Sequence, residues 1–256
     1  MLVYFLFPAK KYKWTVLLAA SLFFYAVAGY RFAYFILFTT LSTYLIALWI
    51  DRISKNSKTL LKSKKSEWDK NQKKAYKNRI KIQKRLVMTL ALVLNFGILA
   101  FLKYFNFFAG SLNDILGSFG MDFSAPTLNL FLPLGISFYT FQTLSYVIDV
   151  YRGEVEPEKN FFFYALFVSF FPQLVQGPIS KFSSLAPQLY APHKFDRDEF
   201  LFGLERILWG FFKKLVIADR VSAVAMHVFS PKFEYTNGSQ IFFGVLAYSF
   251  QIYCDF

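Results

Sequence analysis

Four largely apolar runs, each close to the length that crosses a bilayer, constrain the fold of this chain more than any other feature. They cover residues 14–30, 32–50, 86–108 and 128–150. A membrane-spanning helix needs about 20 apolar residues. In lipid every backbone N–H and C=O must find a partner within the protein, which leaves only helices and closed barrels. A hydrophobic fraction of 55%, with 35 Phe, excludes an ordinary soluble composition. We therefore predict an all-α, polytopic transmembrane protein.

Three further segments are apolar but less regular. Residues 161–175 are short and lead into an interrupted stretch, residues 201–229 are long but charged, and residues 240–256 reach the chain end. With the four runs above they give about six to seven membrane segments, one of them broken or re-entrant. No soluble domain and no internal repeat is visible, so residues 1–256 are predicted to form a single integral membrane domain.

The net charge of +13 is concentrated in one region. Residues 51–85 contain 14 Lys/Arg against three acidic residues, a surplus of +11. A basic run with Trp68 and Tyr76 interleaved is also seen in nucleic-acid binders. Between two membrane spans, however, it is more simply the positive-inside signal, with anionic lipid headgroups as its contact. We predict that 51–85 is a cytoplasmic loop, that the protein is a multi-pass membrane protein, and that it binds no nucleic acid.

The stretch FFPQLVQGPISKF, residues 170–182, interrupts an apolar run with Pro172, Gly177 and Pro178 and carries Gln173 and Gln176. Broken backbone at membrane depth is tolerated only where it is buried in protein or lines a water-filled cavity. The stretch therefore predicts the wall of a polar cavity. The alternative is that the glutamines bond to neighbouring helices, and the same two interpretations apply to Gln142 within residues 128–150.

The same stretch carries a resemblance, together with LPLGISFYTFQTLSYVIDVYRG (132–153), FLKYFNFF (101–108), FFKKLVIADR (211–220) and YCDF (253–256). With these motifs in order over roughly residues 100–256, the chain resembles the membrane-bound O-acyltransferase family, in its bacterial branch of alginate O-acetyltransferase-like proteins. The family is thought to use a histidine deep in the membrane as general base. Its motifs are expected beyond Phe256, so the chain resembles the N-terminal part of such an enzyme, inactive by itself.

The resemblance implies transfer of an acetyl group to hydroxyls of an extracytoplasmic polysaccharide. The donor would be an acetyl thioester or an acyl carrier used as co-substrate, with no bound cofactor. The expected partners are membrane lipids, the polysaccharide, and an acyl carrier or a periplasmic or extracellular acetyltransferase. D-Alanyl transfer to teichoic acids by the same fold is one alternative, and a transporter without chemistry is another. The predicted substrate tunnel is lined by residues of the interrupted stretch and of two other motifs: Gln142, Pro172, Gln173, Gln176, Gly177, Pro178, Tyr253 and Asp255.

No catalytic residue is predicted within the chain itself. Imidazole suits general acid–base work because its pKa lies near working pH. Of the two histidines, His193 lies in a charged loop and His227 near the end of an apolar helix, and neither matches a catalytic motif. The single cysteine, Cys254, is expected to be a small packed residue, and no metal-ligand spacing occurs.

Charged residues in 201–229 follow a regular spacing. Arg206, Lys213 and Arg220 lie seven apart, which places them on one face of an α-helix, with Lys214 set apart from them. A lipid-facing span would not carry such a stripe. A helix that lies partly in the headgroup layer, or that faces a water-filled vestibule, would.

Overall fold

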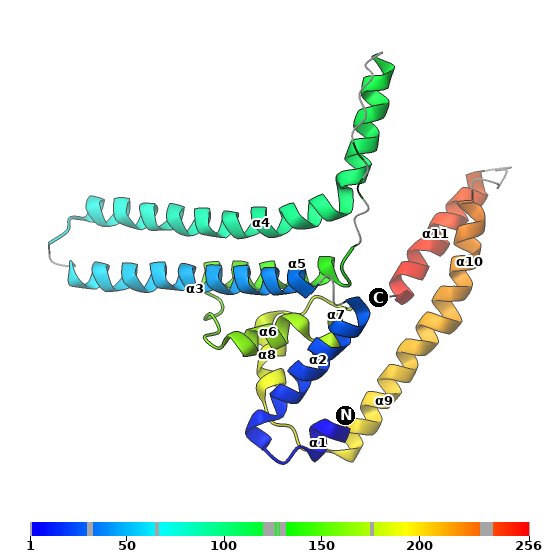
Figure 1. Ribbon diagram of the computed structural model, residues 1–256, viewed down its shortest axis with the longest axis horizontal. Coiled ribbons are helices and arrows are strands. Elements are labelled where there is room, and N and C mark those ends of the chain that lie inside the picture. Colours follow the sequence, from blue (N-terminus) through cyan, green and yellow to red (C-terminus); the bar gives the residue numbers. More distant parts are fainter. Residues whose placement is uncertain are drawn as a thin grey trace. The chain divides into compact units, whose positions relative to one another are not determined.

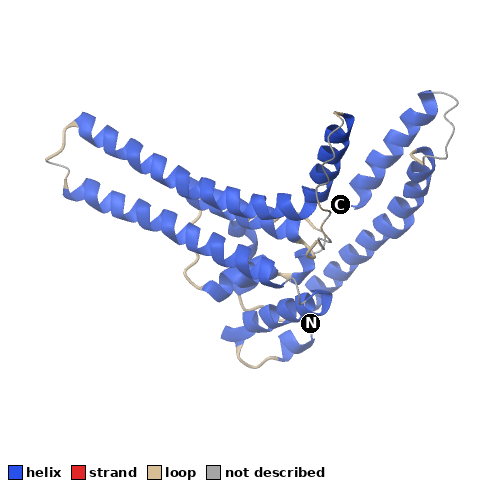
Figure 2. Cartoon of the chain, turned by 45° about the horizontal axis from the view of Figure 1, so that its top comes forward, coloured by secondary structure: helices blue, strands red, loops and turns tan. Residues whose placement is uncertain are grey.

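The computed structural model describes residues 2–29, 33–64, 67–119, 126, 128, 132–174, 177–230 and 238–255. Its contacts divide the chain into two compact units, residues 1–192 and residues 193–256. All regular secondary structure in the described ranges is helical, as Figure 2 shows. The predicted all-α fold class is confirmed.

The first unit is a set of helices around one buried core. In chain order the elements are α1 (Leu2–Leu6), the 3-10 helix η1 (Lys10–Tyr12), α2 (Lys13–Gly29), α3 (Ala33–Ser63), α4 (Lys70–Ser118), α5 (Ile136–Arg152), α6 (Phe161–Ser169), α7 (Phe171–Leu174) and α8 (Phe182–Tyr190). Helices α3, α4 and α5 pack against one another, and α2 packs against α6 (Figure 1). Fully buried aromatic and aliphatic side chains fill the interior, among them Ile50, Tyr139, Tyr146, Tyr164 and Phe167.

Three helices of the described chain contain a stretch long and apolar enough to cross a membrane, namely α2, α3 and α4. Helix α4 has 49 residues, roughly 74 Å at ~1.5 Å per residue, more than twice the hydrocarbon thickness. Helix α5 begins only at Ile136, after a turn in which Gly135 has the left-handed φ of +69°. The total of six to seven membrane segments stays a prediction.

Most of residues 51–85, the predicted basic cytoplasmic loop, is helical in the structure, and its placement in the cytoplasm stays a prediction. Residues 51–63 continue α3 and residues 70–85 begin α4, so only a short connection separates two helices. Lys, Arg and Gln are good helix formers, and a high charge does not oppose a helix that is solvated on one side. The inner side is packed, with Ser57 and Val87 buried. The basic residues therefore lie on a helical hairpin that extends beyond the other helices of its unit (Figure 1).

The second unit is an antiparallel helical pair. Helix α9 (Arg197–Phe211) continues without a break into the π-helix η3 (Phe212–Ala218) and α10 (Asp219–Val228). Helix α11 (Gly238–Asp255) packs against α10 and η3. Gly244 permits this close packing, because a Cβ atom there would lie 2.5 Å from Cγ1 of Val228.

Candidate functional site

The interrupted stretch is broken in the structure as the sequence predicts. Helix α6 ends at Ser169, Phe170 turns the chain with φ −56° and ψ 105°, and the short α7 follows. Residues 177–181 then run without regular structure into α8. Pro172 sits at the start of α7, where its missing N–H costs no helical hydrogen bond.

Side chains from two other helices satisfy the backbone groups that the break releases. In a continuous α-helix the N–H of Phe171 would donate to the carbonyl of Phe167. Instead, the Phe171 N–H donates to Oγ of Ser21 on α2 at 3.3 Å, and Nε2 of Gln142 on α5 donates to the Phe167 carbonyl at 3.1 Å. Ser21 and Gln142 are both buried. The break is therefore built into the packing of the unit, as buried backbone polar groups require.

Gln142 thus ties α5 to α6 through a buried hydrogen bond. Its amide donor is committed to a backbone carbonyl. This matches the helix-bonding alternative for Gln142, whereas the prediction that it lines a tunnel is untested.

The side chain of Gln173 has two polar atoms, of which one has a hydrogen-bond partner and the other has none among the described residues. Its Nε2 donates to Oγ of Ser180 at 2.8 Å, which folds the stretch back on itself. Gly177 lies against the same residue, since a Cβ atom there would be 3.7 Å from Cα of Gln173. Oε1 of Gln173 is buried, and no hydrogen-bond donor of the described residues reaches it. Such an acceptor typically costs about 1–3 kcal/mol, so it is suited to accept a hydrogen bond from a hydroxyl or a water.

The motif before α5 and the interrupted stretch meet at one close contact. A Cβ atom on Gly135 would lie 2.0 Å from the carbonyl oxygen of Leu174, at the end of α7. Gly135 also has φ +69°, a left-handed conformation that costs other L-residues roughly 1–2 kcal/mol. Only glycine satisfies both conditions, so Gly135 fixes where α7 sits against the start of α5.

Tyrosine hydroxyls hold the helices on either side of the break. The hydroxyl groups of Tyr164 and Thr43 are 2.8 Å apart, and the Tyr146 hydroxyl accepts from the Glu158 N–H at 2.9 Å. The Tyr190 hydroxyl, at the end of α8, donates to the Phe163 carbonyl at 2.9 Å. Partial burial raises the pKa of Tyr190, which keeps this donor protonated. These hydrogen bonds hold the helices on both sides of the break in defined positions, as a polar site requires.

The remaining predicted tunnel residues fall into three groups. Pro178 is exposed and lies beside Gly177 in the irregular segment. Gln176 lies outside the residues that the structure describes. Tyr253 and Asp255 belong to the second unit, where Tyr253 is exposed and Asp255 is engaged in an ion pair.

That ion pair centres on Lys214, inside the π-helix. Its Nζ lies 2.7 Å from Oδ1 of Asp255 on α11 and 3.0 Å from Oδ1 of Asp219. Lys214 and Asp219 are five residues apart, the spacing that a π-helical turn brings together. The π-helix also overturns the alignment expected for Lys213 and Arg220. The wider turns of a π-helix do not place residues seven apart on one face. Of the lysines and arginines in this unit, Lys214 is the one that forms ion pairs among the described residues.

Neither histidine is placed as a catalytic base. His193 is exposed in the segment before α9, and His227 is exposed in the last turn of α10, where a basic group complements the helix dipole. Cys254 is buried, as predicted for a small packed residue. The residues that sequence reasoning missed are Ser21 and Ser180. They carried no signal, because their partners are known only from the packing.

The chain is similar to curated enzymes that acetylate polysaccharides. It is 41% identical to the probable alginate O-acetylase AlgI of Pseudomonas aeruginosa over 170 residues, which cover 66% of this chain and 32% of that protein. It is 40% identical to the probable alginate O-acetylase AlgI of Azotobacter vinelandii over 170 residues, 66% of this chain and 33% of that protein. The peptidoglycan O-acetyltransferase of Helicobacter pylori is 33% identical over 273 residues, 95% of this chain and 45% of that protein.

The chain thus spans about a third of the length of the alginate O-acetylases and under half that of the peptidoglycan enzyme. No family model matches the chain. No solved structure matches it.

Proposed function

We propose, from the premise that this chain belongs to the membrane-bound O-acyltransferase family, that its function is transfer of an acetyl group to hydroxyls of an extracytoplasmic polysaccharide. The observation that carries the proposal is the 41% identity over 170 residues to a probable alginate O-acetylase. A second relative is named for peptidoglycan, so the shared chemistry is acetylation of a polysaccharide hydroxyl rather than one particular polymer. The relatives' names support acetyl transfer over D-alanyl transfer and over transport without chemistry.

The reaction would exchange one acyl bond for another. A sugar hydroxyl oxygen forms an ester bond to the acetyl carbon, the C–S bond of a thioester donor breaks, and the hydroxyl proton is transferred to the thiol. General-base help at the hydroxyl is worth about 10² to 10⁴ in rate. We do not assign the base to His193 or His227, and the donor is either an acetyl thioester or an acyl carrier.

The chain is a membrane protein, and we place it as a multi-pass protein of the bacterial cytoplasmic membrane. A donor made in the cytoplasm and an acceptor outside need a polar passage through the bilayer. The break between α6 and α7 supplies irregular backbone of the kind tolerated only inside a protein or beside water. The buried Oε1 of Gln173 gives this passage an acceptor that a sugar hydroxyl can use.

Labelled acetyl transfer to alginate and to peptidoglycan tests the proposal, in membranes that carry this chain within its complete gene product, because the chain spans only 32% of the length of its alginate O-acetylase relative. Wild type should label at least one of the two polymers at hydroxyl positions. Gln173→Leu should lose about tenfold or more of the activity per folded molecule, because a lost hydrogen bond of ~1.4 kcal/mol in the transition state is tenfold in rate. Gln188→Leu is the matched control: this glutamine is exposed on α8 and donates to Ser184 within its own helix.

The outcomes separate the function from the site. If wild-type membranes transfer no label to either polymer above the background of membranes without the protein, the proposed function is wrong. If transfer occurs but Gln173→Leu matches Gln188→Leu, the function stands and Gln173 serves packing only.

A further inference from the structure

A row of four lysines follows one face of α4 in the basic hairpin. Lys70, Lys74, Lys77 and Lys81 are spaced by four, three and four residues, which stacks them on one side of an α-helix. All four are exposed. The arginine in this stretch, Arg79, is nine residues from Lys70 and so falls on the opposite side of the helix.

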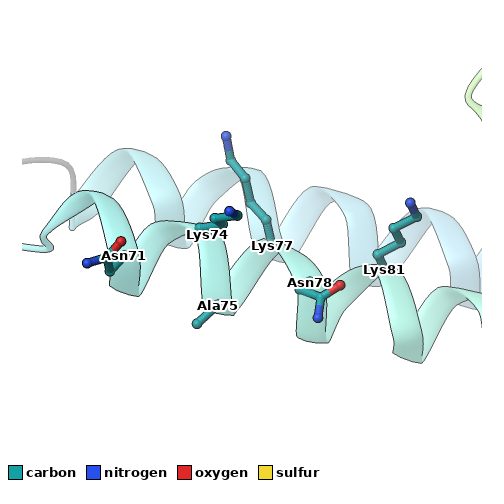
Figure 3. Close-up of a pocket in the computed structure, with 6 residues that line it drawn as sticks. All are labelled: Asn71, Lys74, Ala75, Lys77, Asn78 and Lys81. Carbon is teal, nitrogen blue, oxygen red and sulfur yellow. The ribbon is translucent and has the colours of Figure 1, made fainter.

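Beside the lysines the surface is lined by small side chains. Asn71, Ala75 and Asn78 form a shallow pocket together with Lys74, Lys77 and Lys81. Figure 3 shows Lys77 and Lys81 extending to one side of α4, while Ala75 and Asn78 point away from them. We call the four lysines Lys70, Lys74, Lys77 and Lys81 the lysine face.

The charges of the lysine face repel one another and lower the stability of α4, and in the isolated chain no acidic side chain that the structure describes offsets this repulsion. Like charges at i,i+4 destabilise a helix by about 0.2–0.5 kcal/mol per pair. The acidic residues of the hairpin are used elsewhere: Asp51 pairs with Lys55, Glu67 pairs with Lys64, and Asp69 caps the N-terminus of α4. Within the described ranges no ion pair reaches Lys70, Lys74, Lys77 or Lys81. An anionic partner at the same spacing would remove the repulsion.

We propose that the lysine face docks an acidic helix of a soluble protein. The spacing of four, three and four residues is the one along which two helices present side chains to each other. Lys70 to Lys81 lie 16 to 5 residues before Leu86, where the apolar part of α4 begins, which is roughly 24 to 8 Å along the axis. The headgroup layer extends about 5–7 Å beyond the hydrocarbon, and its attraction falls off within a Debye length of ~8 Å, so Lys70 and Lys74 lie beyond the reach of a membrane surface. This inference does not rest on the proposed acetyl transfer.

The probe is a labelled synthetic helix of about 20 residues, long enough to be helical when bound. It carries Glu at positions i, i+4, i+7 and i+11 in an Ala/Gln background, and a scrambled peptide has the same composition. Binding is measured to the full chain in nanodiscs of neutral lipid. The combined variant Lys70→Gln, Lys74→Gln, Lys77→Gln and Lys81→Gln is compared with Arg52→Gln, Lys58→Gln, Lys62→Gln and Arg79→Gln, which removes four exposed charges of the same hairpin away from the face.

We expect the lysine-face variant to bind the patterned peptide at least tenfold more weakly than wild type, and the control variant to change by no more than about threefold. The scrambled peptide should bind wild type as weakly as the patterned peptide binds the lysine-face variant. Circular dichroism checks that both variants keep their helix content. Because Gln is a good helix former, neither variant should unfold the hairpin.

Four results would overturn the inference. Equal losses in the two variants, or equal binding of the two peptides, would leave only the bulk charge of the hairpin. Lysine-face-dependent binding to vesicles with anionic lipid, without preference for the patterned peptide, would assign the face to the membrane. Lysine-face-dependent binding of a single-stranded RNA probe stronger than that of the peptide would assign it to nucleic acid.

Discussion

Replacement of Gly135 by alanine tests how the start of α5 and the interrupted stretch are joined. The new methyl group would lie 2.0 Å from the Leu174 carbonyl oxygen, a separation that Cβ atoms do not tolerate, and the neighbour is backbone rather than a flexible side chain. The φ of +69° adds the left-handed penalty of roughly 1–2 kcal/mol. Forced displacement of packed backbone costs typically 1–3 kcal/mol more. We expect a total destabilisation of about 2–5 kcal/mol.

Two other glycines of the same unit separate these contributions. Gly153 has φ +81° but open space around its missing side chain, so Gly153→Ala should show the conformational penalty alone, about 1–2 kcal/mol. Gly97 lies inside α4 with an ordinary φ and nothing within 4 Å, so Gly97→Ala should stabilise by up to ~1 kcal/mol. The excess of Gly135→Ala over Gly153→Ala measures the contact with Leu174.

Thermal unfolding in a mild detergent is a suitable assay, because 1 kcal/mol corresponds to roughly 2–4 °C in Tm for a unit of this size. The Tm should fall in the order Gly97→Ala, wild type, Gly153→Ala, Gly135→Ala. Equal Tm values for Gly135→Ala and Gly153→Ala, within ~2 °C, would refute the close approach of α7 to Gly135. They would also remove the argument that the two motifs form one structure.

Three other sets of substitutions test separate parts of the chain. Gln142→Leu removes the donor to the Phe167 carbonyl and should lower the unfolding free energy by about 1–2 kcal/mol, with acetyl transfer per folded molecule unchanged; a selective loss of activity would instead place Gln142 at the substrate. Lys214→Met should lower the Tm of the chain clearly more than Lys213→Met, because of these two lysines Lys214 alone has ion-pair partners among the described residues; equal shifts would contradict this role. Alanine at His193 or His227 should leave turnover within about threefold of wild type, whereas a loss of 10² or more would identify a general base.

The break in the interrupted stretch was predictable, but its partners were not. Pro172 and the Gly177-Pro178 pair interrupt helical hydrogen bonding whatever surrounds them, so local sequence is sufficient to locate the break. The Phe171 N–H is satisfied by Ser21, 150 residues away, and the Phe167 carbonyl by Gln142, 25 residues away. Spacing within one segment says nothing about which side chain of another segment will reach it.

The helices that form most of residues 51–85 were predictable from periodicity, which the prediction of a basic loop between two spans did not use. Along residues 70–91 the less exposed positions include Tyr76, Ile80, Val87 and Ala91, four or seven residues apart. That spacing predicts a helix packed on one side, even where many of the other residues are Lys or Arg. The signal was therefore present in the sequence.

The π-helix had no such signal. Nothing in FFKKLVIADR distinguishes it from an α-helical segment, and α-helical spacing placed Lys213, not Lys214, on the charged face. The wider turn depends on what it gains from outside the segment, namely the ion pair between Lys214 and Asp255 at 2.7 Å. Tertiary contacts decide such a local geometry.

The contacts explain why motifs far apart in this chain belong together. Residues 132–135 and 170–174 meet where the Gly135 backbone touches the Leu174 carbonyl, and residues 211–220 and 253–256 meet where Lys214 bridges Asp219 and Asp255. The first contact is steric and the second electrostatic, but each makes the cost of a change on one side depend on the residue opposite. Changes at residues in direct contact are not additive, with coupling of about 0.5–3 kcal/mol. The effect of a substitution in one motif on the free energy of unfolding therefore depends on which residues the other motif carries.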